Sequence, residues 1–114
     1  MKVSEAMRAG CKISIPLTGG LFRMTAQGVM QASALGAAIL GAAPDTKPYT
    51  FLKHEDWHDW PGCTVMKELG VFDTVVLHPV RDVEVALSYA LNDLNDNYRW
   101  TRERIIEWLE DNNL

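Results

Sequence analysis

The residues with the clearest chemical potential lie in the middle of the chain, where His54, Glu55 and His58 form the pattern H-E-x-x-H. On a helix this spacing places two imidazoles on one face, four residues apart, where both can bind a zinc ion. The glutamate between them can then activate a zinc-bound water as a general base. The pattern therefore suggests a metal site at His54 and His58, with Glu55 as the catalytic residue.

These five residues resemble the signature of the zincin metallopeptidases, and the resemblance covers no more of the chain. Where the metzincin pattern has a glycine and a histidine further on, this chain has Pro61 and Thr64. We therefore interpret the pattern as an incidental polar helix face and expect no required cofactor. A minimal zinc-dependent hydrolase is the alternative. Three residues are open as its third ligand: Glu68, His78 and Glu84.

Cys63 and the tryptophans are the other side chains that could carry a function. Cys63 follows Pro61-Gly62 at the start of an expected helix, from where a cysteine can act as a nucleophile, but a lone cysteine of this kind is typical of a core. Trp57 and Trp60 lie among charged residues beside a proline, so we expect them on a surface for a partner. We assign Trp100 and Trp108 to the core.

Composition limits the class of protein. A chain of 114 residues that is 47% hydrophobic fits a single domain spanning 1–114. Its longest weakly polar run, 29–44, is shorter than the roughly 20 residues that a membrane-spanning helix needs. The two cysteines are too few for a disulfide framework, so we expect reduced thiols and a cytoplasmic protein.

The charge is concentrated at the C-terminal end. Residues 82–114 carry eight acidic and three basic side chains, and the whole chain has a net charge of −4. The last two expected helices resemble a helix-turn-helix in outline, but an acidic surface repels DNA phosphates. We therefore do not expect nucleic acid as a partner.

Hydrophobic periodicity predicts most of the elements. Apolar residues from Val83 to Leu94 form one helical stripe that Asp82 could cap, and Asn95-Asp96-Asn97 ends this helix. A final helix follows Thr101, a good N-cap. Further helices are expected at 5–9, 25–43, 51–60 and 63–69, and a strand at 73–77. Alternation at 11–16 and 21–24, around Thr18-Gly19-Gly20, predicts a β-hairpin.

Within these elements, the glycines of the 25–43 helix indicate contact with another part of the chain. A glycine inside a helix costs about 1 kcal/mol relative to alanine. Gly36 and Gly41 therefore suggest that another element crosses this helix at close range.

Three segments carry a wider resemblance. They are S-E-A-x-R-x-G at 4–10, A-L-G-A-A at 34–38 and L-N-D-x-x-x-W-T-R-E-x-I-x-x-W at 94–108. In this order they resemble a loose family of small, uncharacterised bacterial and phage proteins. Many members of this family carry a C-P-x-C-like pair before the last helices, whereas here Cys63 has no such partner, because Met66 occupies the position of the second cysteine. The resemblance implies a shared fold and a phage or prophage origin, without an activity.

Together these observations predict a mainly α protein of the α+β class, a single small domain with four to five helices and a short β-hairpin near the N-terminus. We expect a cytoplasmic accessory or regulatory protein that acts by protein–protein contacts rather than as an enzyme. A homo-oligomer, in the simplest case a homodimer, is compatible with this role.

Overall fold

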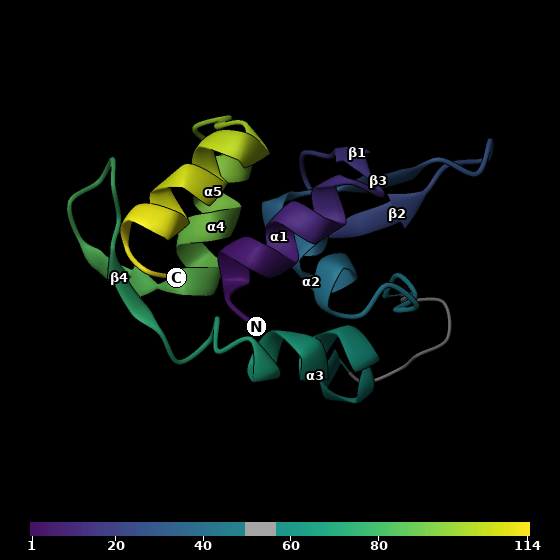
Figure 1. The fold of residues 1–114 in the computed structure, drawn as a ribbon, viewed down its shortest axis with the longest axis horizontal. Helices are drawn as coiled ribbons and strands as arrows, with labels where there is room; N and C mark the ends of the chain where they lie inside the picture. The colour runs from purple at the N-terminus through teal and green to yellow at the C-terminus, as the bar shows by residue number, and fades with distance from the viewer. Residues whose placement is uncertain (50–56) are drawn as a thin grey trace.

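The computed structural model describes residues 1–49 and 57–114 (Figure 1). Along this part of the chain the elements are α1 (Val3–Cys11), β1 (Ile15–Pro16), β2 (Phe22–Met24), β3 (Met30–Ala32), α2 (Ala34–Ala42), the 3-10 helix η2 (Trp57–Asp59), α3 (Pro61–Glu68), β4 (Val75–Leu77), β5 (Glu84–Ala86), α4 (Leu87–Asp96) and α5 (Arg102–Asp111). The expected mainly α member of the α+β class is confirmed.

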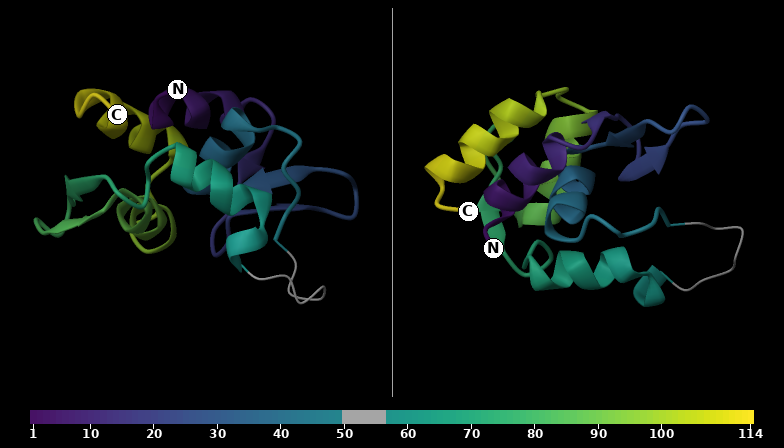
Figure 2. Two further views of the ribbon diagram at one scale, coloured as in Figure 1. Left: turned by 90° about the horizontal axis from the view of Figure 1, so that it is seen from below. Right: turned by 45° about the vertical axis from the view of Figure 1, so that its right-hand side comes forward.

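The helices form the body and the two small sheets lie at its ends. In Figure 1, α1 crosses α2 at the centre, α4 and α5 lie on one side of this pair, and α3 runs below it. The sheet β1-β3-β2 lies at one end of the long axis, and the β4–β5 ribbon lies at the other (Figure 2). Buried residues from the helices and from β2 and β3 form one hydrophobic core.

The helix α2 is buried from Ala34 to Leu40, and most of its side chains are small. A Cβ atom on Gly41 would lie 1.6 Å from the carbonyl oxygen of Ala6 on α1, and a Cβ on Gly36 would lie 1.8 Å from that of Leu21. The close approach expected at these two glycines is therefore confirmed. Gly10 of α1 makes the reciprocal contact, because its Cβ would meet the carbonyl oxygen of Ala37 at 1.7 Å.

The N-terminal hairpin has different strands from the ones expected. β2 pairs antiparallel with β3, while β1 pairs in parallel with β3 instead of with β2. The connection between β2 and β3 contains Gly28 at φ +81, and Ser33 then caps α2 by accepting a hydrogen bond from the Gly36 N–H. The helix predicted over 25–43 therefore begins only at Ala34, because the first part of that range forms the return strand.

The end of the chain matches the prediction in α5 and differs from it in α4. Thr101 accepts a hydrogen bond from the Arg104 N–H and caps α5, and α4 ends at Asp96 as expected. However, Asp82 does not cap α4. It has φ +55 in the turn of the β4–β5 hairpin, and the exposed Val83 lies just before β5, so α4 begins at Leu87.

Two further starts of helices were predicted wrongly. Ser4 lies inside α1, where its side chain is buried and its N–H and hydroxyl both donate to the Leu114 carbonyl oxygen. Pro61 begins α3 as its first residue, a position in which the missing N–H of proline costs nothing.

The expected short strand near 73–77 is confirmed as β4. No helix in the described ranges combines the length and apolarity needed to cross a membrane.

Candidate functional site

Four aromatic side chains from separate segments meet near one end of the molecule. Phe22 comes from β2, Tyr49 from the loop after α2, Trp57 from η2, and Trp60 from the residue that precedes α3. The ring centroids of Trp57 and Trp60 lie 5.2 Å apart, and Tyr49 lies 5.5 Å from Trp57 and 5.8 Å from Trp60. Tyr49 meets both indoles edge-on, which is a preferred geometry for aromatic pairs.

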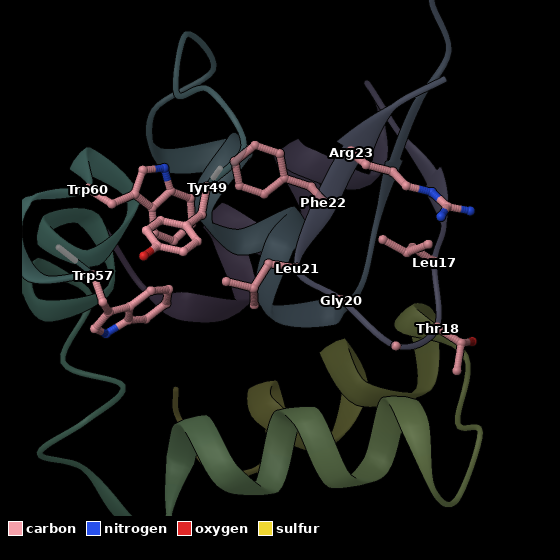
Figure 3. A pocket seen from close by; sticks show the side chains of 10 residues that line it. Leu17, Thr18, Gly20, Leu21, Phe22, Arg23, Tyr49, Trp57 and Trp60 are labelled. Carbon is pink, nitrogen blue, oxygen red and sulfur yellow. The ribbon is translucent and has the colours of Figure 1, made fainter. Parts of the chain in front are cut away.

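These rings form one wall of a pocket of about 360 Å³. Figure 3 shows the aromatic residues on one side and the loop that contains Gly20 and Leu21 on the other. The lining consists of Leu17, Thr18, Gly19, Gly20, Leu21, Phe22, Arg23, Tyr49, Trp57 and Trp60. A concave, mainly apolar site with a few polar groups is typical of ligand and peptide binding.

Trp60 is the fixed part of the aromatic wall. It is only 2% exposed, and its indole N–H donates a hydrogen bond of 2.7 Å to the carbonyl oxygen of Lys47. Gly62 lies directly beneath the ring, where a Cβ atom would approach the indole to 2.3 Å. Trp60 therefore supplies shape and has no free polar group to offer a ligand.

Trp57 is the accessible part of the same wall. It is 36% exposed, and it lies on the short η2 helix rather than in the core. An exposed tryptophan packed on a rigid partner offers a large contact area at a low cost in conformational entropy. Both tryptophans were expected on a partner surface. The structure brings both to this pocket, but Trp60 is buried in the core and only Trp57 is exposed, so the expectation was wrong for Trp60.

The opposite rim is a glycine loop that is held from below by the end of α4. The Gly19 N–H donates to Oδ1 of Asp96 at 3.0 Å, and Asn95 Nδ2 donates to the Leu17 carbonyl oxygen at 2.9 Å. Gly19 has φ +84, a conformation that glycine adopts without strain. Because both hydrogen bonds come from α4, the rim is positioned by residues that follow it in the sequence by more than 70 places.

Arg23 is the charged residue of the pocket lining. Its Nε donates a hydrogen bond of 2.7 Å to Oε1 of Gln31, the residue opposite it on β3. Among the residues that the structure describes, no acidic side chain pairs with this guanidinium. Among the described lining residues, the pocket therefore combines an aromatic wall with one positive charge at its edge, and Figure 3 shows the Arg23 side chain extending away from the aromatic rings.

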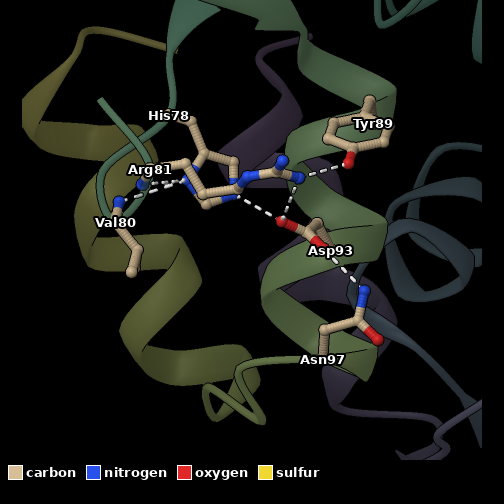
Figure 4. A network of polar contacts seen from close by, with 6 residues as sticks. All are labelled: His78, Val80, Arg81, Tyr89, Asp93 and Asn97. Atoms are coloured by element: carbon tan, nitrogen blue, oxygen red, sulfur yellow. Dashed lines mark hydrogen bonds and ion pairs between the residues drawn. The ribbon is translucent and has the colours of Figure 1, made fainter. Parts of the chain in front are cut away.

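A second polar cluster lies at the other end of the molecule, around His78 (Figure 4). His78 Nδ1 accepts hydrogen bonds from the N–H groups of Val80 and Arg81, at 3.1 and 3.0 Å. Its Nε2 must therefore carry the proton, which it donates to Oδ2 of Asp93 at 2.8 Å. Asn97 Nδ2 donates to the other oxygen of Asp93 at 2.6 Å.

This cluster holds the turn of the β4–β5 hairpin against α4. The side chains of His78 and Asp93 are 0% and 5% exposed, so a substrate does not reach their reactive atoms. His78 was one of three candidates for a third zinc ligand, but both of its ring nitrogens are used in these hydrogen bonds. We therefore assign His78 and Asp93 a structural role.

The residues of the predicted zinc site fall in two groups. His54 and Glu55 lie outside the described residues, and His58 is an exposed residue of η2. Within residues 1–49 and 57–114, no three His, Cys, Asp or Glu side chains gather closely enough to hold one metal ion. Cys63 is 1% exposed and packs in the core, as expected.

The other lining residues of the pocket could not be assigned to one site from the sequence. Leu21, Phe22 and Arg23 were expected as a strand, and Tyr49 lies in a stretch for which no element was expected. The one local signal was Thr18-Gly19-Gly20, which correctly predicts a turn at the rim. Comparison of the chain with family models, curated proteins and solved structures finds no match.

Proposed function

We propose that this chain is a small accessory or regulatory protein that acts by binding another protein through the aromatic pocket. The observation that carries the proposal is the exposed Trp57 beside the buried Trp60 on one wall of a preformed pocket. Tryptophan and tyrosine are enriched among the residues that dominate protein interfaces. The phage or prophage origin implied by the sequence resemblance is compatible with such a role.

The chemistry of the lining indicates what enters the pocket. Trp57, Tyr49 and Leu21 offer apolar surface, which fits an aromatic or aliphatic side chain of the partner. Arg23 adds a guanidinium without an acidic partner among the described residues, and it matches a carboxylate. The proposed occupant is therefore a partner segment that carries an apolar side chain near an aspartate or a glutamate.

A peptide selection tests this proposal, because it requires no identified partner. A random peptide library is panned on the immobilised protein, and the enriched peptides are then titrated while the tryptophan fluorescence is followed. We expect enriched peptides to pair an apolar residue with an acidic one and to shift the emission. Trp57→Ala should weaken their binding at least tenfold, because it removes the exposed wall.

Two variants make the selection specific. Arg23→Glu should reduce binding of acidic peptides and leave that of their amide analogues nearly unchanged. Tyr89→Ala is the matched control, since Tyr89 is an exposed aromatic residue of α4 outside the pocket lining. Peptides that bind wild type, Trp57→Ala and Arg23→Glu equally well would show that this pocket is not the binding site.

Metal analysis separates this proposal from the zinc hydrolase. Protein purified without a polyhistidine tag should contain no stoichiometric zinc, and His58→Ala should leave its metal content unchanged. Stoichiometric zinc that is lost in His58→Ala would support the hydrolase that uses His54, Glu55 and His58.

A further inference from the structure

The β4–β5 ribbon exposes aliphatic side chains at the end of the molecule away from the aromatic pocket. In Figures 1 and 2 the ribbon projects beyond the helices. Val75 and Leu77 of β4 are 63% and 58% exposed, the largest exposures among the large apolar residues that the structure describes after Met1. The side chain between them, Val76, is half-buried and packs against the core. β4 therefore presents one apolar face and one open edge to solvent.

The hydrogen-bond ladder shows which backbone groups lie on that edge. The His78 N–H donates to the Val83 carbonyl oxygen, and the Leu87 N–H donates to the Thr74 carbonyl oxygen, both at 2.8 Å. Positions 74, 76 and 78 therefore bond inward to β5, because bonding positions alternate in an antiparallel pair. The N–H and C=O groups of Val75 and Leu77 point outward, and no hydrogen bond within the described residues uses them.

β4 also lacks the protection that the other edge strands have. Folded proteins block open edges with charged residues, prolines or bulges, because an unprotected edge pairs with other chains. Pro16 lies on β1, Arg23 on β2 and Glu84 on β5. β4 consists of two valines and a leucine. Among the four edge strands of the described sheets, it alone is unprotected.

We propose that β4 is covered by β4 of a second copy of this chain, in an antiparallel pair with its two-fold axis at Val76. In this register Val75 lies opposite Leu77 of the other copy. The backbone N–H and C=O groups of Val75 and Leu77 point outward, so each Val75 forms hydrogen bonds with Leu77 of the other copy. The edge is thus complementary to itself, and the product is a four-stranded sheet with the order β5-β4-β4-β5.

The ribbon and its surroundings expose enough apolar surface to add to the strand pairing. The apolar residues exposed on and around the ribbon are Phe72, Val75, Leu77, Val80, Val83 and Tyr89. A fully uncovered aromatic side chain presents roughly 150–250 Å² and an aliphatic one somewhat less, so these residues offer on the order of 500 Å² per copy. Two copies then reach about 1,000 Å², near the lower limit of a specific interface. We therefore expect a weak dimer that forms at high protein concentration.

Sedimentation or light scattering over a concentration series tests the dimer. The mass should rise from that of one 12.8 kDa chain towards twice that value as concentration increases to several hundred micromolar. Leu77→Lys should remain monomeric throughout, and it should still fold because the new lysine lies opposite Glu84. Val29→Lys, an exposed change elsewhere, should dimerise like wild type. A monomeric wild type, or a Leu77→Lys variant that still dimerises, would overturn the proposal.

A cysteine placed on the axis tests the register. In the proposed pair the two Val76 residues face each other as a pair without hydrogen bonds, with Cα atoms about 4.5 Å apart, which a disulfide can span. Val76→Cys should therefore form a covalent dimer under mild oxidation, and mass spectrometry should identify the 76–76 link. Val29→Cys is the control, because Val29 is exposed and lies outside the ribbon. A link through position 29 without one through position 76 would contradict the proposed pairing.

Discussion

At the scale of single residues, His78 shows how a polar side chain is built into the core. Its Nδ1 accepts hydrogen bonds from the N–H groups of Val80 and Arg81, which have no backbone acceptor in this tight turn. Its Nε2 donates to the buried carboxylate of Asp93. Arg81 extends the cluster to the surface, where its guanidinium donates to the Tyr89 hydroxyl at 2.6 Å. The hydrogen bonds fix one tautomer of His78 and hold its imidazole between the turn and α4.

His78→Ala should lower the free energy of unfolding by about 3 kcal/mol, because it leaves Asp93 and two N–H groups without their partner. Urea unfolding followed by circular dichroism measures the change. Tyr89→Phe, which removes only the exposed end of the cluster, should cost less than about 1 kcal/mol. A His78→Ala variant as stable as wild type would show that water replaces the imidazole.

Cys11 gives a pH dependence with a defined sign. Burial raises the pKa of its thiol above the ordinary value of 9.0, and this outweighs the opposing effect of the nearby Arg102. Because the folded state disfavours the thiolate, the stabilisation from Cys11 is complete below pH 9 and is lost as the pH rises through the raised pKa. Cys11→Ser should therefore weaken the fall in stability between neutral and strongly alkaline pH. Urea unfolding at several pH values measures the slope, and identical slopes would contradict the assignment.

At the scale of elements, the contact between α1 and α2 depends on two glycines that approach backbone rather than side chains. Gly41 lies on the Ala6 carbonyl group and Gly10 lies on that of Ala37. Such contacts bring two helix axes closer than any larger residue allows. The low helix propensity of glycine is therefore offset by the packing of an almost entirely buried α2.

Gly41→Ala should destabilise the protein by about 2 kcal/mol or more, although alanine is the better helix former. A Cβ atom at this position overlaps the Ala6 carbonyl oxygen, and backbone cannot move aside as a flexible side chain does. Gly20→Ala is the matched control, because the nearest atom to its Cβ is a leucine methyl at an ordinary 3.6 Å. Thermal unfolding of both variants measures the difference, and equal melting temperatures would refute the close crossing.

At the scale of the whole molecule, the two proposed surfaces lie at opposite ends of the long axis, which extends over 38 Å. The aromatic pocket is at the end that carries β2, and the open edge of β4 is at the other. A dimer that forms through β4 would therefore turn its two pockets outward. Such an arrangement lets one dimer hold two partner segments, which increases the apparent affinity for a partner that presents several copies.

The two surfaces should be separable by mutation. Leu77→Lys should abolish the dimer and leave the affinity for a selected single peptide unchanged. Trp57→Ala should weaken binding of the peptide and leave the dimer intact. Each variant is measured by peptide titration and by sedimentation. A Leu77→Lys variant that loses peptide binding while it remains folded would show that the two surfaces act together.

The sequence by itself determined the elements whose signals are local. The Thr101 cap of α5, the polar stop at the end of α4 and the short strand β4 follow from a few neighbouring residues. The glycines of α2 also predicted that another element approaches closely, because a glycine inside a helix has a cost that packing must offset. The sequence likewise singled out Trp57 and Trp60.

Only the tertiary structure decided which segments meet. β3 pairs with both β1 and β2, and β5 pairs with β4, so that α4 begins only at Leu87. Strand pairing depends on distant partners more than on intrinsic preference. The pocket combines residues 17–23 with Tyr49, Trp57 and Trp60, and its rim is held by α4. No local pattern encodes such a meeting, since it depends on how the helices pack around one core.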